Sequence, residues 1–168
     1  RLMRSRAALA DALEASRTRR HCAGLPAPNW TTAFRWVHGC HDGLDGLVVE
    51  ALGDAIVVRL RTADWWSEQA FDPLLDALGE VFNTRYVKVI VAERKKHTPR
   101  ERQELEDRLD ERATACGWKV PEVPWTILEN GKRFEVSVRE GFSLGLFWDM
   151  RVPRFDLAQR WYGKRVAN

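Results

Sequence analysis

The chain has 168 residues, of which 45% are hydrophobic and 30% are charged, and its formal net charge is +3. This composition excludes a disordered protein, and no apolar run approaches the roughly 20 residues of a membrane-spanning helix. The basic N-terminal segment has no hydrophobic stretch like that of a signal peptide, so we expect a cytoplasmic protein. Three widely spaced cysteines predict no disulfide framework, and the nearby histidines match no standard zinc spacing, so we predict no metal site.

The first predicted element is a helix that reaches about Ser16, because Leu9 and Leu13 recur at helical spacing opposite an arginine-rich face. This predicted helix starts at the first residue of the chain, so no capping residue precedes it. A turn rich in glycine and proline follows at residues 24–29. We therefore assign residues 1–29 to a linker helix and turn.

Two clusters of positive charge are candidates for contact with the phosphates of RNA. One lies at the end of the linker helix, and the other follows a predicted strand. The alternative is that both are solvated helix ends. The candidate RNA-binding residues are Arg17, Arg19, Arg20, Arg94, Lys95 and Lys96.

The next segment predicts a small sheet and one covering helix. Residues 34–38 alternate as in a short strand, and β-branched runs at 47–50 and 55–60 flank a Gly-Asp turn, which predicts a hairpin. Aromatic and leucine residues at helical spacing predict a helix over about 64–82. Residues 86–91 are apolar on both faces, which favours a central strand.

A second helix is predicted over residues 98–116. Thr98 is a suitable N-cap, Pro99 fits the first helical position, and Glu101 completes a capping box. The apolar face of this helix is thin and the rest is charged. We interpret it as an exposed appendage inserted into the domain.

The last part of the domain predicts another hairpin, because Asn130-Gly131 is the favoured type I′ turn pair between two β-prone runs. A helix is predicted from residue 153 to about 161. Antiparallel hairpins with interspersed helices indicate an α+β domain. We bound this domain at residues 30–150 and expect residues 151–168 to form a further helix and strand.

Four short motifs occur in a fixed order along the chain. Together they resemble the S-adenosylmethionine-dependent large-subunit ribosomal RNA methyltransferases, the family typified by enzymes that make 5-methylcytosine. The resemblance covers about residues 30–168. The motifs are residues 38–49 (beginning His-Gly), 129–136 (containing Asn-Gly), 145–151 (Gly-Leu-Phe-Trp-Asp-Met-Arg) and 163–168 (Gly-Lys-Arg-Val-Ala-Asn).

The resemblance implies that the chain is the central domain of such an enzyme, with its linker helix. The N-terminal PUA domain would be absent, and only the first strand of the Rossmann-like catalytic domain would be present. In the complete protein the cofactor would be S-adenosylmethionine. The resemblance places Gly145, Phe147, Asp149 and Arg151 against the cofactor pocket, where the two charged groups would meet the amino-acid end of the cofactor. The alternative is that Asp149 and Arg151 only pin the loop to the next helix.

We therefore expect the substrate-side and cofactor-lid part of an rRNA methyltransferase, inactive alone and with no catalytic residue of its own. Nothing in the resemblance gives the nucleophilic role of the family's cysteine to Cys22, Cys40 or Cys116. The expected partners are ribosomal RNA and either the missing methyltransferase domain or a second copy of the chain. The alternative functions are a self-sufficient RNA-binding module and a protein-interaction module without catalysis.

Overall fold

The computed structural model describes residues 5–92, 97–121, 125–136 and 151–160, and in them the predicted α+β class is confirmed. The helices and strands, in chain order, are α1 (Arg6–Cys22), β1 (Ala33–His38), β2 (Leu47–Leu52), β3 (Ala55–Leu60), α2 (Glu68–Phe82), β4 (Tyr86–Val91), α3 (Pro99–Ala115), β5 (Trp125–Glu129), β6 (Lys132–Val136) and α4 (Arg151–Arg160), with short 3₁₀ turns η1 (Gly39–Asp42) and η2 (Ala63–Trp65).

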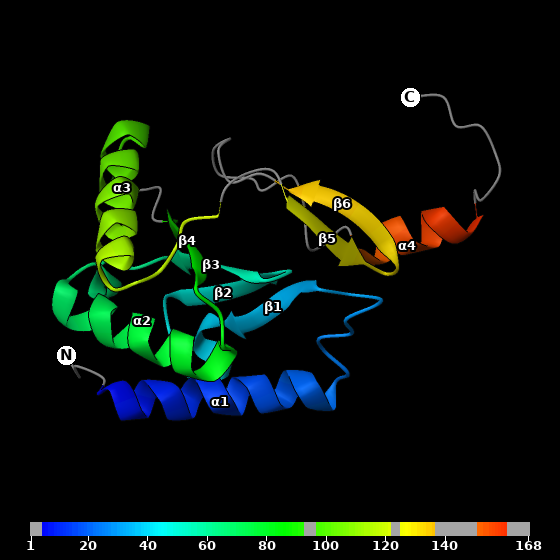
Figure 1. The fold of residues 1–168 in the computed structure, drawn as a ribbon, viewed down its shortest axis with the longest axis horizontal. Helices are drawn as coiled ribbons and strands as arrows, with labels where there is room; N and C mark the ends of the chain where they lie inside the picture. The colour runs from blue at the N-terminus through cyan, green and yellow to red at the C-terminus, as the bar shows by residue number, and fades with distance from the viewer. Residues whose placement is uncertain (1–4, 93–96, 122–124, 137–150, 161–168) are drawn as a thin grey trace.

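Four strands form one sheet in the order β1-β2-β3-β4 (Figure 1). β2 and β3 make the predicted hairpin, in which Leu52 pairs with Ala55 across a two-residue turn. β4 pairs with β3 in parallel, a pairing that the predicted hairpins did not specify. A parallel pair needs a long crossover connection, and α2 supplies it here.

Among the strands that the structure describes, β4 lies at the edge of this sheet, which differs from the prediction of a central strand. Its side chains are nevertheless buried on both faces. Val87, Val89 and Val91 join the main core, whereas Ile90 joins a smaller cluster on the opposite face. The apolar pattern therefore correctly indicated that both faces of the strand are covered, but it did not indicate how many strands pair with it.

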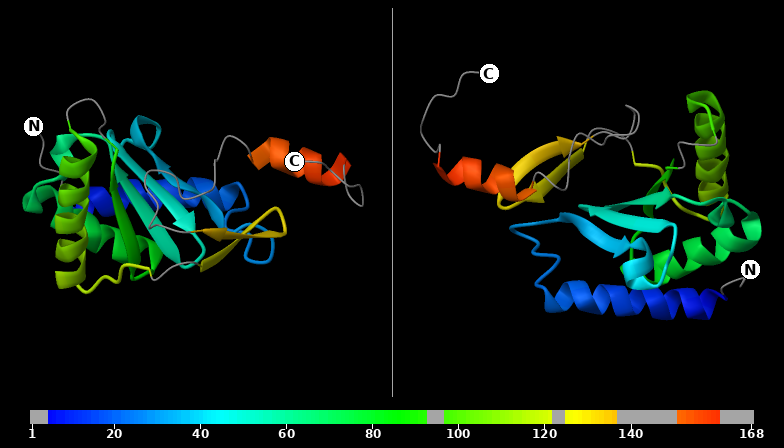
Figure 2. Two further views of the ribbon diagram at one scale, coloured as in Figure 1. Left: turned by 90° about the horizontal axis from the view of Figure 1, so that it is seen from above. Right: turned by 180° about the vertical axis from the view of Figure 1, so that it is seen from behind.

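Two layers cover the sheet. α1 and α2 pack side by side on one face and form the main core with it, as the views from the front and from behind show (Figures 1 and 2). On the other face, the β5–β6 hairpin contributes Ile127 and Val136 to a cluster with Leu52 and Val57. None of the helices in the described ranges is long and apolar enough to cross a membrane.

The start and the length of α1 differ from the prediction. Ser5 caps the helix, because its Oγ accepts a hydrogen bond from the backbone N–H of Ala8 at 3.2 Å. The helix continues past Ser16 to Cys22. Leu9 and Leu13 are buried as expected, and the last helical turns carry arginines that contact the loop after β1.

The helix α3 is docked on the sheet, so the interpretation as an exposed appendage was wrong. The predicted capping box is present, with Thr98 and Glu101 exchanging hydrogen bonds. The Leu109 side chain is buried in the main core. Backbone N–H groups along the edge of β4 point at α3, and the carboxylates of Asp110 and Glu106 accept their hydrogen bonds. An open sheet edge presents unpaired N–H groups, so this helix covers an edge that would otherwise be exposed.

The second hairpin is confirmed. Asn130 and Gly131 have φ angles of 51° and 72°, as a type I′ turn requires. The ring of Trp30 lies against the turn, because a Cβ atom at Gly131 would come within 2.7 Å of it. α4 begins at Arg151, two residues before the predicted start, which leaves Pro153 in the first turn where its missing N–H is tolerated.

Candidate functional site

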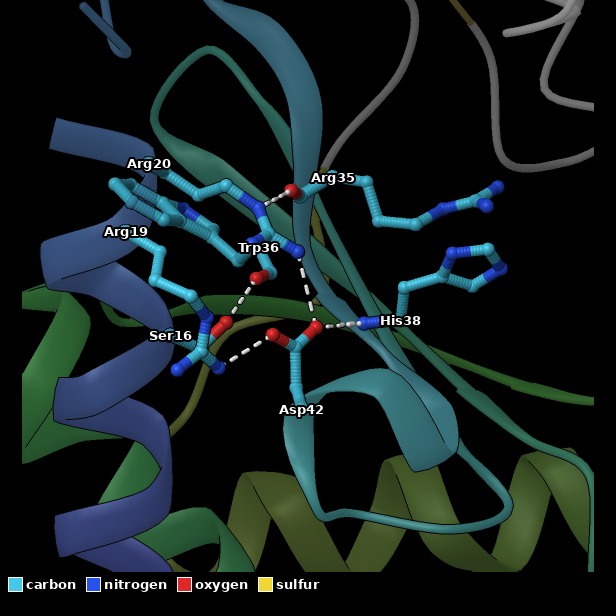
Figure 3. Close-up of polar contacts among 7 residues, drawn as sticks. All are labelled: Ser16, Arg19, Arg20, Arg35, Trp36, His38 and Asp42. Atoms are coloured by element: carbon cyan, nitrogen blue, oxygen red, sulfur yellow. Dashed lines mark hydrogen bonds and ion pairs between the residues drawn. The ribbon is translucent and has the colours of Figure 1, made fainter. Parts of the chain in front are cut away.

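A buried carboxylate, Asp42, joins α1 to the sheet (Figure 3). Its side chain is 2% exposed. One oxygen accepts from Arg19 at 2.6 Å, and the other accepts from Arg20 at 2.9 Å and from the backbone N–H of His38 at 2.6 Å. The carboxylate thus ties the last turns of the linker helix to the end of β1.

Two further bonds complete this junction, in which α1 lies against β1. The Ser16 hydroxyl donates to the carbonyl of Trp36, and the Arg20 Nε donates to the carbonyl of Arg35 at 3.0 Å (Figure 3). Both acceptors belong to β1, near the irregularity in its pairing with β2. Side chains of the helix therefore donate hydrogen bonds to carbonyl groups of β1, and these bonds fix the position of the helix along the strand.

The junction sets the charge states of its members. Burial disfavours the ionised form of Asp42, but the bond from Arg19, the backbone bond from His38 and the charge of Arg20 outweigh it, so the pKa of Asp42 lies below its usual value. Burial and the nearby charge of Arg35 lower the pKa of His38. Asp42 is therefore ionised and His38 neutral near pH 7.

The three arginines of α1 that are predicted to bind RNA all form ion pairs or hydrogen bonds within the chain. Arg19 and Arg20 pair with Asp42, whereas Arg17 pairs with Glu14 at 2.8 Å and donates to the Val81 carbonyl at 3.3 Å. The Arg19 side chain is still 48% exposed. The fold brings Arg19 and Arg20 together at Asp42, whereas Arg17 binds the end of α2, and the role of all three towards RNA stays a prediction.

Most of the other predicted site residues lie outside the described ranges. Arg151 is described, and its Nη2 donates to the Thr31 hydroxyl at 3.3 Å. This contact links the first residue of α4 to the segment before β1. The predicted residues outside the described ranges are Gly145, Phe147, Asp149, Arg94, Lys95 and Lys96.

A second buried carboxylate anchors α4 to the β5–β6 hairpin. The Arg154 guanidinium donates to both oxygens of Glu129 at 2.8 Å, and the Glu129 side chain is 1% exposed. The same guanidinium lies 5.8 Å from the ring centre of Phe134. Two-pronged arginine–carboxylate bonds fix orientation as well as distance. The helix that follows the predicted cofactor loop is thus held in a defined position.

A third buried carboxylate, Glu50, lies on the sheet face opposite α1 and α2. It pairs with Arg35 of β1 at 2.9 Å and with Arg59 of β3 at 2.8 Å, and its side chain is 1% exposed. Glu50 is not among the predicted site residues. The available signal was one glutamate inside an otherwise apolar strand, with an arginine in each flanking strand.

The histidines and cysteines do not form a metal site in the described part of the chain, where no group of three or more His, Cys, Asp or Glu side chains could hold an ion. The rings of His38 and His41 lie near one another, with their centres 5.4 Å apart. Cys22 and Cys40 are exposed, and all three cysteines are free thiols.

Comparison with known proteins gives relatives of one kind. No protein-family model matches the chain. Over 146 residues the chain is 31% identical to a ribosomal RNA large subunit methyltransferase of Deinococcus radiodurans. The alignment covers 82% of this chain and 32% of the relative. A ribosomal RNA large subunit methyltransferase I of Photobacterium profundum is 29% identical over 144 residues, 86% of this chain and 34% of the relative. The chain thus spans about a third of the length of these relatives.

Solved structures show the same fold. A candidate SAM-dependent methyltransferase from Streptococcus mutans superposes with a TM-score of 0.70 at 18% identity, over 95% of this chain and 37% of that one. A candidate methyltransferase complexed with SAH gives a TM-score of 0.71 at the same identity and coverage. The similar architecture and the sequence identity to the Deinococcus relative agree with the ordered motifs: this chain belongs to the family of large-subunit ribosomal RNA methyltransferases.

Proposed function

We propose that this chain forms the central, non-catalytic part of an S-adenosylmethionine-dependent rRNA methyltransferase. It supplies surface on the substrate side and the segment that closes over the cofactor pocket, and it does not transfer methyl groups alone. The observation that carries the proposal is the alignment of 82% of the chain with about a third of an rRNA methyltransferase. A cytoplasmic location and rRNA as the partner belong to the same proposal.

The geometry of α4 supports the role in closing the cofactor pocket. The predicted cofactor segment, residues 145–151, ends at the first residue of this helix. The bond pair between Arg154 and the buried Glu129 holds the helix on the hairpin, and Arg151 is held at Thr31. A loop with a fixed end orients its side chains at a lower entropic cost than a free loop. In this proposal Asp149 and Arg151 recognise the charged amino-acid end of the cofactor.

The proposal is tested with a chimera. The segment of the Deinococcus radiodurans relative that aligns with this chain is replaced by these 168 residues, and the product is assayed with rRNA transcript and S-adenosylmethionine carrying a labelled methyl group. We expect the chimera to methylate the transcript and the isolated chain to transfer no label. Nucleoside mass spectrometry identifies the modified base.

A matched pair of variants in the chimera tests the role of α4. Glu129→Gln removes the charge that holds Arg154, and we expect weaker SAH binding by calorimetry, measured at a temperature where circular dichroism shows the variant to be folded. Glu135→Gln alters an exposed glutamate on the neighbouring strand and serves as the control. A folded chimera that binds SAH but methylates no RNA would contradict the substrate-side role, and unchanged SAH affinity in the Glu129→Gln variant would contradict the role in closing the pocket.

A further inference from the structure

An open cavity of about 780 Å³ lies where the four-stranded sheet meets the second hairpin. Its walls come from the turn between β2 and β3, the start of β4, residues 119–121 after α3, and β5. This volume is within the range of about 300–1,000 Å³ that is typical of pockets for small ligands. The cavity contains no residue of the predicted cofactor segment among its described lining residues.

An aromatic ring and a cation stand together in one wall. Tyr86 is 41% exposed, which is unusual for a large aromatic side chain at the start of a buried strand. The Lys119 Nζ lies 5.9 Å from the centre of the Tyr86 ring. The wall therefore offers an aromatic ring with a positive charge over it.

The backbone fixes these two side chains relative to one another. The Lys119 N–H donates to the Arg85 carbonyl at 2.7 Å, and the Val87 N–H donates to the Lys119 carbonyl at 2.9 Å. These bonds form a parallel bridge between Tyr86 and Lys119. Trp118, which is buried in the main core, holds the segment from the inside. The pair is thus arranged before any ligand arrives, which lowers the entropic cost of binding.

Another part of the wall, next to the start of β4, is negative and polar. Asp54, in the turn between β2 and β3, lines the cavity, and Thr126 is exposed in it. The carbonyl of Asp54 accepts a bond from the Thr84 hydroxyl, which itself accepts from the Tyr86 N–H at 3.2 Å, so the turn is tied to the start of β4. A carboxylate repels phosphate and accepts bonds from hydroxyl or amino groups. A bound anion would therefore lie on the side of Lys119.

We propose that this cavity binds one unstacked nucleotide of single-stranded RNA. The base stacks on Tyr86, its phosphate meets Lys119, and Asp54 accepts a hydrogen bond from the ribose hydroxyl or from an amino group of the base. Sequence-tolerant recognition of single strands combines aromatic stacking with a nearby cation in this way. The inference rests on the proposed function, which gives RNA as the substrate class, and it places a contact with that substrate away from the arginines of α1.

The test uses the complete 168-residue chain and a fluorescein-labelled 12-nucleotide single-stranded RNA, with affinity measured by anisotropy. We expect tighter binding to this RNA than to a fully paired hairpin. Tyr86→Ala should weaken binding about tenfold, whereas Tyr86→Phe, which keeps the ring, should leave it nearly unchanged. Lys119→Ala should reduce the slope of log affinity against log salt by about one. Arg100→Ala removes one exposed charge from α3 and is the matched control.

The outcomes separate this inference from the proposed function. Equal binding by wild type and the Tyr86→Ala variant, with both folded by circular dichroism, would overturn the inference while leaving the methyltransferase chimera untouched. Displacement of the RNA by SAH would assign the cavity to a nucleoside cofactor and would also overturn it. Photo-crosslinking of 4-thiouridine RNA to the peptide containing Tyr86 would support it, even if the chimera proved inactive.

Discussion

The helix α1 is held to the sheet by a buried carboxylate and α3 by two half-buried carboxylates, and the two sites are built in opposite ways. At α1 the carboxylate belongs to the sheet side, and the helix brings the cations Arg19 and Arg20 to Asp42. At α3 the helix brings the carboxylates Asp110 and Glu106 to strand N–H groups, and the strand supplies one cation, Lys88.

The two sites also differ in the sign of their pKa shifts. The pKa of Asp42 is lowered, because two arginines and a backbone N–H outweigh its burial. The pKa of Asp110 is raised, because burial outweighs the bond from Lys88. Burial likewise raises the pKa of Glu106 despite its bond from Val91. At these sites burial disfavours the ionised carboxylate, and only the donors around Asp42 outweigh it.

The largest expected effect comes from Asp42→Asn. The amide keeps one acceptor but turns an N–H₂ group towards arginine or backbone donors, and it leaves two guanidinium groups without their counter-charge. We expect a loss of about 2–4 kcal/mol in the free energy of unfolding, below the full cost of breaking a buried ion pair because Arg19 is half-exposed. Urea denaturation measures this loss. Asp11→Asn, on the exposed side of α1, should stay within about 0.5 kcal/mol.

The same substitution at Asp110 should cost less, about 1–2 kcal/mol. Its ionised form is already disfavoured by burial, and the amide oxygen can still accept the bond from the Val89 N–H. Lys88 also keeps the charge of Glu106 nearby. Glu104→Gln, on the exposed face of α3, is the control. A larger loss at Asp110 than at Asp42 would contradict the comparison of the two sites.

The features that were predicted correctly depend on residues close together in the sequence. The turn at Asn130-Gly131 and the capping box at Thr98 follow from the backbone preferences of a few adjacent residues, and both were confirmed. The roles of Asp42, Glu50 and Glu129 could not be predicted, because the arginines that pair with them lie 9 to 25 residues away in the chain and meet them only after folding.

The docking of α3 was missed for a related reason. A buried helix face is predicted from apolar residues at helical spacing, and this helix has few of them. Its Asp110 and Glu106 read as solvated charge in the sequence, although they satisfy the edge of β4 in the structure. Charged side chains that accept hydrogen bonds from the edge of a strand give no periodic signal in the sequence.

Stability against pH should separate the two sites by sign. Asp42 has a folded pKa below its unfolded value of about 3.9, so its stabilisation is complete above that pH and is lost as the pH falls through the folded pKa. Asp110 has a raised folded pKa, so ionising it lowers stability as the pH rises from about 3.9 through that pKa.

Urea midpoints from pH 7 to pH 3 test both signs. The gap between wild type and the Asp42→Asn variant should stay level down to about pH 5 and close below about pH 4. The gap between wild type and the Asp110→Asn variant should widen as the pH falls from 7 towards 4. Parallel curves for the two variants would show that the donor count does not distinguish the sites.

The smallest expected effect concerns the thiols at the ends of the two helices. Cys22 ends α1 and is exposed, whereas Cys116 caps α3 and is partly buried. Burial and then the charge of Asp72 raise the pKa of the Cys116 thiol. The thiolate is the reactive form, so Cys116 should react more slowly with a disulfide reagent than Cys22 in matched single-cysteine variants.

Equal rates in urea would show that the difference belongs to the folded state. Because Arg112 and Asp72 tie the end of α3 to α2, the reaction rate of Cys116 also reports how firmly that helix is docked. Asp110→Asn should therefore accelerate Cys116 and leave Cys22 unchanged, and Asp42→Asn should do the reverse. Acceleration of both thiols by either variant would mean that the two helices open together, and the two carboxylate sites would then be parts of one cooperative unit.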